Sequence, residues 1–164
     1  MEEKFLHAEE HAEERNSAFH PRRDLSSSSR LAYAQFDLSK LKGKTTFCAA
    51  EKLKSQKLIE QLFKEGKSVS HNGFTLVYLF GPLSTHYPAL AGFSVPKKSF
   101  KHAVDRNRIK RLLREAYRHQ KFALYQKLVA DKKQACLMWV YKGKELPEYD
   151  KVVKEVQFCL KKLL

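Results

Sequence analysis

The chain has 164 residues, of which 32 are Lys or Arg and 18 are Asp or Glu, so its formal net charge is +14 at pH 7. This length suits one domain with its own core and is too short for two. No uninterrupted apolar run approaches the length of a membrane-spanning helix, and a run such as LVYLF is strand-sized.

Three cysteines lie far apart along the chain, at Cys48, Cys136 and Cys159. Their odd number and wide spacing fit neither a disulfide framework nor a zinc site. Thiols of this kind are typical of a reducing compartment, and the sequence therefore predicts a cytoplasmic protein.

The positive charge is concentrated in the second part of the chain. Residues 1–42 hold 7 basic and 8 acidic residues, whereas residues 43–164 hold the remaining 25 basic and 10 acidic ones. The first part also contains the repeat HAEEHAEE and the run SSSS, which are typical of a flexible, low-complexity segment. We therefore expect residues 1–44 to be an N-terminal extension and residues 45–164 to form the domain. Such a basic domain should bind a polyanion, with nucleic acid favoured over an anionic membrane surface.

The first half of the domain is predicted to contain one helix and two strands. Apolar residues at helical spacing, ended by Gly66, indicate a helix over residues 51–65. GFTLVYLF (73–80) and ALAGFSV (89–95) have the composition of strands. We expect these two strands to pair antiparallel through the loop 81–88.

The second half is predicted to contain two helices and a strand between them. A basic helix covers about residues 102–119 and resumes to Ala130 after a break near Gln120. QACLMWVY (134–141) is apolar enough for a buried strand, and Pro147 suits the first turn of a last helix. The order α-β-β-α-β-α predicts an α/β (α+β) two-layer sandwich, in which helices pack on one small mixed sheet.

The basic helix has an apolar side and a cationic side. DRNRIKRLLREAYR (105–118) carries five arginines and one lysine. At 100° per residue, one side is an apolar stripe that must face the sheet. That stripe consists of Ile109, Leu112, Leu113, Ala116 and Tyr117. The opposite side is centred on Asn107, Arg111, Arg114 and Arg118, and is flanked by Arg108 and Lys110. Arg106 falls near the apolar edge, so its head group must either reach outward or lie at the first turn.

This cationic side lacks the acidic partners of an ordinary solvated helix. Between Lys97 and Lys121, only Asp105 and Glu115 offset ten basic residues. Like charges one turn apart destabilise a helix, so an external anion should neutralise them. The planar fork of arginine suits phosphate oxygens. The segment is therefore predicted to be a surface for a phosphate backbone.

The same residues carry a resemblance to a known family. GFSVPKK (92–98), followed by AVDRNRIKRLLREAYR (103–118), closely resembles the signature of the bacterial ribonuclease P protein subunit, in which a strand and two lysines lead into a helix carrying R-N-R-x-K-R. Upstream, Phe47, Glu51 and Leu53 match the family's F…E-x-L element. LFKEGKSV (62–69) matches its helix end and glycine turn. The resemblance covers about residues 45–164.

The resemblance implies a protein subunit that binds a catalytic RNA and the 5′ leader of precursor tRNA, and that assists endonucleolytic removal of the leader. The chemistry would belong to the RNA and its Mg²⁺ ions, so this chain would hold no catalytic residue, metal or cofactor, and no protein partner is implied. The family also implies a left-handed βαβ crossover at the basic helix, where general principles favour a right-handed one. The residues expected to bind RNA are Lys97, Lys98, Arg106, Asn107, Arg108, Lys110, Arg111, Arg114 and Arg118.

Four further residues are candidates for contact with the leader. They are Phe47, Ile59, Phe63 and Tyr78. The family often has an aromatic residue at the position of Ile59, where a nucleotide would here find an aliphatic surface. Either Val77 or Tyr78 could take the place of an aromatic residue on the family's first strand, and the pleat puts these two on opposite faces.

Two other functions stay open at this point. A ribosome-associated RNA-binding protein would show the same charge pattern without promoting cleavage. A self-sufficient nuclease would need clustered carboxylates for metal ions, and the basic part has no D-x-D or comparable spacing. Its four histidines also show no carboxylate partner in the sequence; they are His71, His86, His102 and His119.

Overall fold

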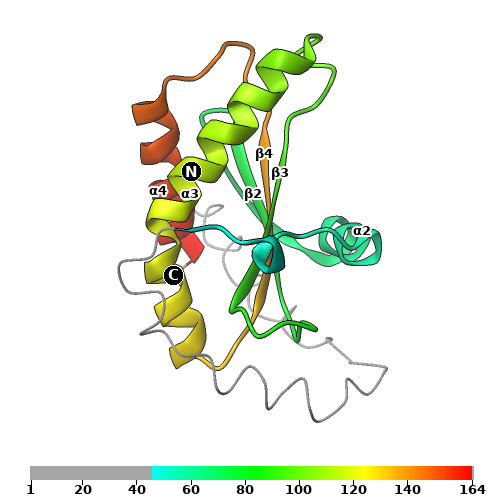
Figure 1. Cartoon of the computed structure of the whole chain (residues 1–164), viewed down its shortest axis with the longest axis vertical. Coiled ribbons are helices and arrows are strands. Elements are labelled where there is room, and N and C mark those ends of the chain that lie inside the picture. Colours follow the sequence, from blue (N-terminus) through cyan, green and yellow to red (C-terminus); the bar gives the residue numbers. More distant parts are fainter. Residues whose placement is uncertain (1–45, 164) are drawn as a thin grey trace, which may run out of the picture.

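The computed structural model describes residues 46–163, so the extension expected at residues 1–44 lies outside the described residues (Figure 1). The described elements are η2 (Ala49–Glu51), α2 (Gln56–Glu65), β1 (Lys67–His71), β2 (Phe74–Phe80), β3 (Ala89–Ser94), α3 (Ala103–Ala130), β4 (Ala135–Tyr141) and α4 (Tyr149–Leu163). The strands form one mixed sheet in the order β1-β2-β4-β3. The α+β sandwich with a mixed sheet that the sequence predicts is confirmed, with helices on both faces of the sheet where two layers were expected.

Helices cover both faces of this sheet. Figure 1 shows α3 and α4 on one side and the shorter α2 on the other. The larger core, here called the α3/α4 core, is built around side chains that include Leu76, Tyr117, Leu137, Trp139 and Val156. The smaller α2 core consists of Leu53, Leu62, Val77, Leu83, Leu90, Cys136, Met138 and Val140. Strand β4 contributes to both cores and is buried along its whole length, as its continuous apolar sequence indicates.

The predicted pairing of the strands at 73–80 and 89–95 is wrong. Strand β4 lies between β2 and β3, antiparallel to β2 and parallel to β3. The loop 81–88 crosses the start of β4, where backbone hydrogen bonds from Gly81 N–H to Gln134 O and from Ala135 N–H to Pro88 O, both 3.0 Å, join its ends to that strand and the Gln134 side chain bonds its middle. The amide group of Gln134 accepts a hydrogen bond from the Leu83 N–H at 2.8 Å and donates to the carbonyls of Thr85 and Tyr87 at 2.8 and 3.0 Å. Long-range polar contacts of this kind leave no periodic signal in the sequence.

Strand β1 was not predicted, because KSVSH carries one half-buried apolar residue, Val69, among exposed polar ones. It forms a hairpin with β2 through Asn72 and Gly73, whose φ angles are 45° and 82°. An Asn-Gly pair with two positive φ angles is the preferred two-residue hairpin turn. The dipeptide was therefore the signal that could have identified this strand.

Two helix boundaries also differ from the prediction. The helix expected at 51–65 begins only at Gln56, where the Ser55 hydroxyl accepts a hydrogen bond from the Leu58 N–H, and a 3-10 turn stands before it. Helix α3 continues through Gln120 without a break. The parallel crossover β3–α3–β4 is present, and its left-handedness stays a prediction.

The β1–β2 hairpin is fastened to α4 by a polar cluster. The carboxylate of Glu155, which is 7% exposed, bonds His71 Nδ1 at 2.6 Å and accepts from Asn72 Nδ2 at 2.8 Å. Burial alone would raise the pKa of Glu155, but these hydrogen bonds outweigh it and leave the pKa below its ordinary value. The expectation that His71 has no carboxylate partner is thus wrong, and its ring also stacks on Phe158.

Candidate nucleic-acid interface

Helix α3 has the two sides that its sequence predicts. Ile109, Leu113, Ala116 and Tyr117 are at most 1% exposed and pack in the α3/α4 core, with Leu112 half-buried beside them. The opposite side is solvent-exposed at Asn107, Arg108, Arg111 and Arg114. These four residues are called the cationic side of α3 below. Packing of the apolar stripe fixes the direction in which the cationic side faces.

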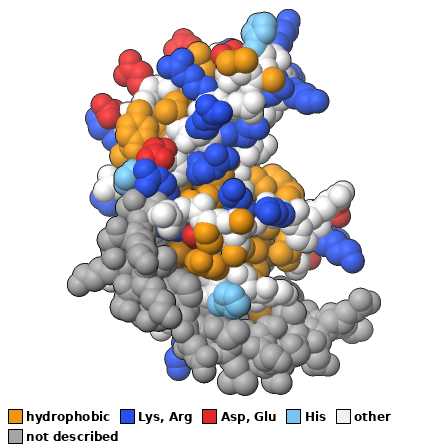
Figure 2. All heavy atoms as spheres, viewed as in Figure 1, with side chains coloured by type: hydrophobic (Ala, Val, Ile, Leu, Met, Phe, Trp, Pro, Cys, Tyr) orange, Lys and Arg blue, Asp and Glu red, His pale blue; other side chains and the backbone are white. Residues whose placement is uncertain are grey.

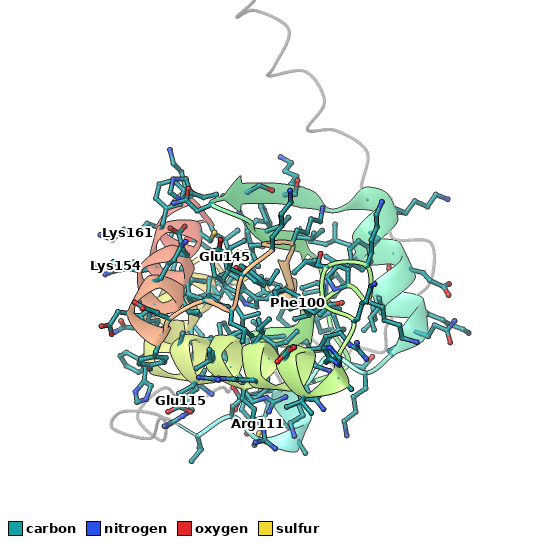
Figure 3. All side chains as sticks on the ribbon, turned by 90° about the horizontal axis from the view of Figure 1, so that it is seen from above. Phe100, Arg111, Glu115, Glu145, Lys154 and Lys161 are labelled. Carbon is teal, nitrogen blue, oxygen red and sulfur yellow. The ribbon has the colours of Figure 1, made fainter. Side chains whose placement is uncertain are left out.

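The cationic side forms a continuous basic surface with neighbouring lysines. Figure 2 shows Lys and Arg side chains gathered along the face that α3 presents. In Figure 3, Arg111 points away from the sheet. Lys97 and Lys98 are exposed in the turn before α3, and Lys110 is half-buried. Lys97, Lys98, Arg108, Lys110 and Arg111 form no ion pair with another residue in 46–163. Such uncompensated charge is the electrostatic requirement for binding a phosphate backbone.

Arg118, by contrast, is already engaged by Glu115. Its guanidinium donates two parallel hydrogen bonds to that carboxylate, one of them from Nε at 2.7 Å. His119 Nε2 lies 3.1 Å from the same carboxylate, so this histidine also has the acidic partner that the sequence did not reveal. The hydrogen bonds from Arg118 lower the pKa of Glu115 to about 2, so the pair stays charged at neutral pH. Glu115 thereby neutralises one end of the basic surface.

We expect Glu115→Gln to strengthen RNA binding. The substitution weakens the hydrogen bonds that hold Arg118 on this side chain and removes one negative charge that faces the same anion. If Arg118 then contacts a phosphate, the slope of log K against log salt steepens by about 0.7–0.9. The measurement is a salt titration of RNA affinity, with Asp131→Asn at the far end of α3 as the charge-matched control. Equal effects of the two variants would place Arg118 outside the bound RNA.

The sequence predicts that the head group of Arg106 either reaches outward or lies at the first turn of the helix. The structure places it at the first turn of α3. One terminal nitrogen, Nη1, donates to the carbonyl oxygens of Phe100 and Lys101 at 2.8 and 2.6 Å. Its side chain is half-buried. Arg106 therefore bonds the backbone of the β3–α3 turn, unlike the exposed arginines that follow it in the helix.

Arg114 is supported from beneath by aromatic residues of the same sequence signature. Its Cζ atom lies 5.8 Å from the centroid of the Phe93 ring, within the range of a cation–π contact. Phe93 packs edge-on against Phe47 and Tyr117, with centroid distances of 5.7 and 5.9 Å. Phe93, the phenylalanine of GFSVPKK, thus packs against the α3/α4 core and also contacts the guanidinium group of the exposed Arg114.

Lys121 does not belong to the basic surface, although it extends the same run of basic residues. Its side chain is 3% exposed and forms an ion pair with Glu51, which is 1% exposed. The ammonium group also donates to the Thr46 carbonyl at 2.6 Å, and the Tyr125 hydroxyl donates to Glu51 Oε2 at 2.6 Å. Sequence reasoning missed this pair. The signal was available, since Lys121 falls on the apolar side of α3, one turn after Tyr117.

The four leader candidates do not share one surface. Phe47 and Tyr78 pack against the α3/α4 core, whereas Ile59 packs against the α2 core on the other face of the sheet. Phe63 is 55% exposed on α2. Contact of these four residues with the leader stays a prediction.

The described residues also include thiols and the residue types that commonly bind metal ions. Within residues 46–163, no three His, Cys, Asp or Glu side chains are grouped so that they could hold a metal ion. Burial raises the pKa of the Cys136 and Cys159 thiols to about 11, which keeps them protonated. None of the helices in the same range combines the length and the apolar character needed to cross a bilayer.

Comparison with known proteins gives a consistent result. The family model described as Ribonuclease P matches residues 47–164. The ribonuclease P protein component of Porphyromonas gingivalis is 36% identical over 113 residues, which span 68% of this chain and 81% of that relative. The component of Nitrosococcus oceani is 46% identical over 65 residues, which span 40% of this chain and 52% of that relative, so this match covers about half of its length.

A solved structure shows the same fold. The RNase P protein from Thermotoga maritima superposes with a TM-score of 0.56 at 23% identity, covering 68% of this chain and 96% of that chain. The basic helix after two lysines, the mixed sheet and the family match over most of the chain agree with one another. The chain belongs to the family of ribonuclease P protein components.

Proposed function

We propose that this chain, as a ribonuclease P protein component, binds the catalytic RNA of that enzyme and assists removal of the 5′ leader from precursor tRNA. The observation that carries the proposal is the cationic side of α3, which is exposed and faces away from the core. Together with Lys97 and Lys98, it offers fixed charges to RNA phosphates. The three cysteines are unpaired, which supports a reducing, cytoplasmic location.

The geometry suits RNA because the cations are preorganised. Arg108, Arg111 and Arg114 project from a 28-residue helix whose other side is packed in the core. Binding therefore does not have to order the backbone of this helix, which lowers the conformational entropy lost on association. The aromatic support beneath Arg114 restricts that side chain further. For the leader, the candidates are Ile59 and Phe63 on α2, and Phe47 and Tyr78 on the other face of the sheet.

The proposal places the chemistry on the RNA subunit, with Mg²⁺ ions bound there. In keeping with the family resemblance, the proposal assigns no catalytic step to the residues of this chain. Its contribution is to bind, to position and to neutralise phosphate charge. We infer no further protein partner and no membrane contact.

The test is reconstitution with a bacterial ribonuclease P RNA and a precursor tRNA at low Mg²⁺. We expect the full chain to raise the rate of correct 5′ cleavage above that of the RNA alone, and to show no cleavage by itself. Binding to the RNA without any gain in cleavage would favour a ribosome-associated RNA-binding protein. Metal-dependent cleavage without the RNA subunit would favour a self-sufficient nuclease. Either outcome would overturn the proposal.

A further inference from the structure

The turn between β3 and α3 presents two lysines from a short, anchored segment. The N–H groups of Ser99 and Phe100 donate to the Pro96 carbonyl at 3.1 and 3.3 Å, which closes the turn. The Phe100 ring is 7% exposed and stacks on Tyr141 in the α3/α4 core. Figure 3 shows Phe100 directed into the interior. The turn is thus fixed at one end by the strand and at the other by a buried ring.

Arg106 supplies the remaining link between this turn and the helix. The carbonyls of Phe100 and Lys101 come just before the first turn of α3, and Nη1 of Arg106 bonds both of them. The N-cap residue His102 makes no side-chain cap. Both protons of Nη1 are therefore committed to the backbone, in charge-assisted hydrogen bonds that are stronger than neutral ones.

Arg106 and Arg111 contrast within the same helix. Arg111 is exposed and makes no ion pair within the described residues, so its guanidinium group is available to bind a phosphate. Arg106 is half-buried, and its head group is directed at its own backbone. Arg106 and Arg111 each contribute one positive charge to the sequence, but their different contacts indicate different roles.

We propose that Arg106 is a positioning residue, which holds the Lys97–Lys98 turn in a fixed relation to the cationic side of α3. This inference rests on the proposed function, since it concerns how that surface meets RNA. Phosphates of a folded RNA have fixed positions, so two groups of cations bind them together only if their separation is also fixed. Arg106 provides that constraint through the two carbonyls, and its effect on binding passes through Lys97 and Lys98.

The first test uses the free protein and compares Arg106→Met with Arg111→Met, the same change on the same helix. Hydrogen exchange is measured at the amides of Ser99 and Phe100, which close the turn. We expect exchange to accelerate in Arg106→Met and to stay at the wild-type rate in Arg111→Met. Circular dichroism confirms that both variants fold. Unchanged exchange in Arg106→Met would overturn the proposal.

The second test is a double-mutant cycle on binding of ribonuclease P RNA. We expect Arg106→Met to weaken binding about 10-fold in the wild-type chain, but less than about 2-fold in the K97A/K98A variant, because coupled residues are not additive. Arg111→Met should weaken RNA binding by the same factor in the wild-type chain and in the K97A/K98A variant. If Arg106→Met weakened RNA binding by the same factor in both backgrounds, Arg106 would act as a direct phosphate ligand, and the proposal would be wrong. If the wild-type chain failed to bind the RNA, the proposed function would fail, while the exchange comparison would still report on the contact of Arg106 with the turn.

Discussion

Replacing Arg111 and Arg114 together with alanine is expected to weaken binding of ribonuclease P RNA by about 100-fold or more at low salt. Each arginine should lose a charge-assisted hydrogen bond to phosphate, worth about 1.5–3 kcal/mol. The slope of log K against log salt should flatten by about 0.7–0.9 for each lost contact, because fewer counterions are released. Both side chains are exposed, so the fold should be retained.

The matched control changes the same number of charges elsewhere. Lys127 lies at the far end of α3 and Lys154 on the outer side of α4, and both are exposed. Lys127→Ala with Lys154→Ala lowers the net charge equally but should leave the salt slope nearly unchanged. A loss of affinity equal to that of the arginine variant would mean that net charge, and not the cationic side of α3, controls binding. If the slope of log K against log salt were unchanged in the arginine variant, neither Arg111 nor Arg114 would contact a phosphate.

The two sides of α3 could be predicted because the information is local. Residues three and four apart share one side of a helix, so the apolar stripe and the exposed arginines follow from spacing alone. The strong apolar run of β4 likewise indicated a strand buried on both faces. The family signature added the expected partner, since it joins a strand, two lysines and the arginine helix in one stretch.

The strand order could not be predicted because it depends on contacts far apart in the sequence. The β2–β3 connection is only eight residues long, which favoured a direct pairing of these strands. In the structure, that loop is held across the start of β4 by Gln134, 49 residues beyond Thr85. Apolar patterning leaves this strand order open, because the contacts that accompany it join residues far apart in the sequence.

The contacts of the individual basic side chains could also not be predicted from the sequence. Arg106, Arg111, Arg118 and Lys121 all contribute to the same basic run, yet they contact backbone carbonyls, solvent, Glu115 and Glu51 respectively. A charge count cannot distinguish these environments. The position of each residue on the helix could, in the case of Lys121, have revealed a buried partner.

The second large effect is expected on stability, from Lys121→Met. The variant leaves the carboxylate of Glu51 buried without its cation, and removing one partner of a buried pair typically costs about 3–5 kcal/mol. Glu51 retains hydrogen bonds from the Tyr125 hydroxyl and the Cys48 N–H, but these do not balance its charge. Urea unfolding, followed by circular dichroism, measures the loss. Lys127→Met, exposed on the same helix, is the control and should be close to neutral.

The double variant Lys121→Met with Glu51→Gln separates the charge from the packing. A neutral glutamine can keep the hydrogen bonds from Tyr125 and Cys48 without a buried charge, so the double variant should recover much of the stability that Lys121→Met loses. Costs that simply add would show that the two residues act independently. The pair fastens residues 46–51 to α3, and the chain then runs along the outer edge of β3, where the Leu53 N–H donates to the Ala91 carbonyl at 3.0 Å. Loss of the pair should therefore expose that sheet edge and make residues 46–53 the first segment to exchange amide protons.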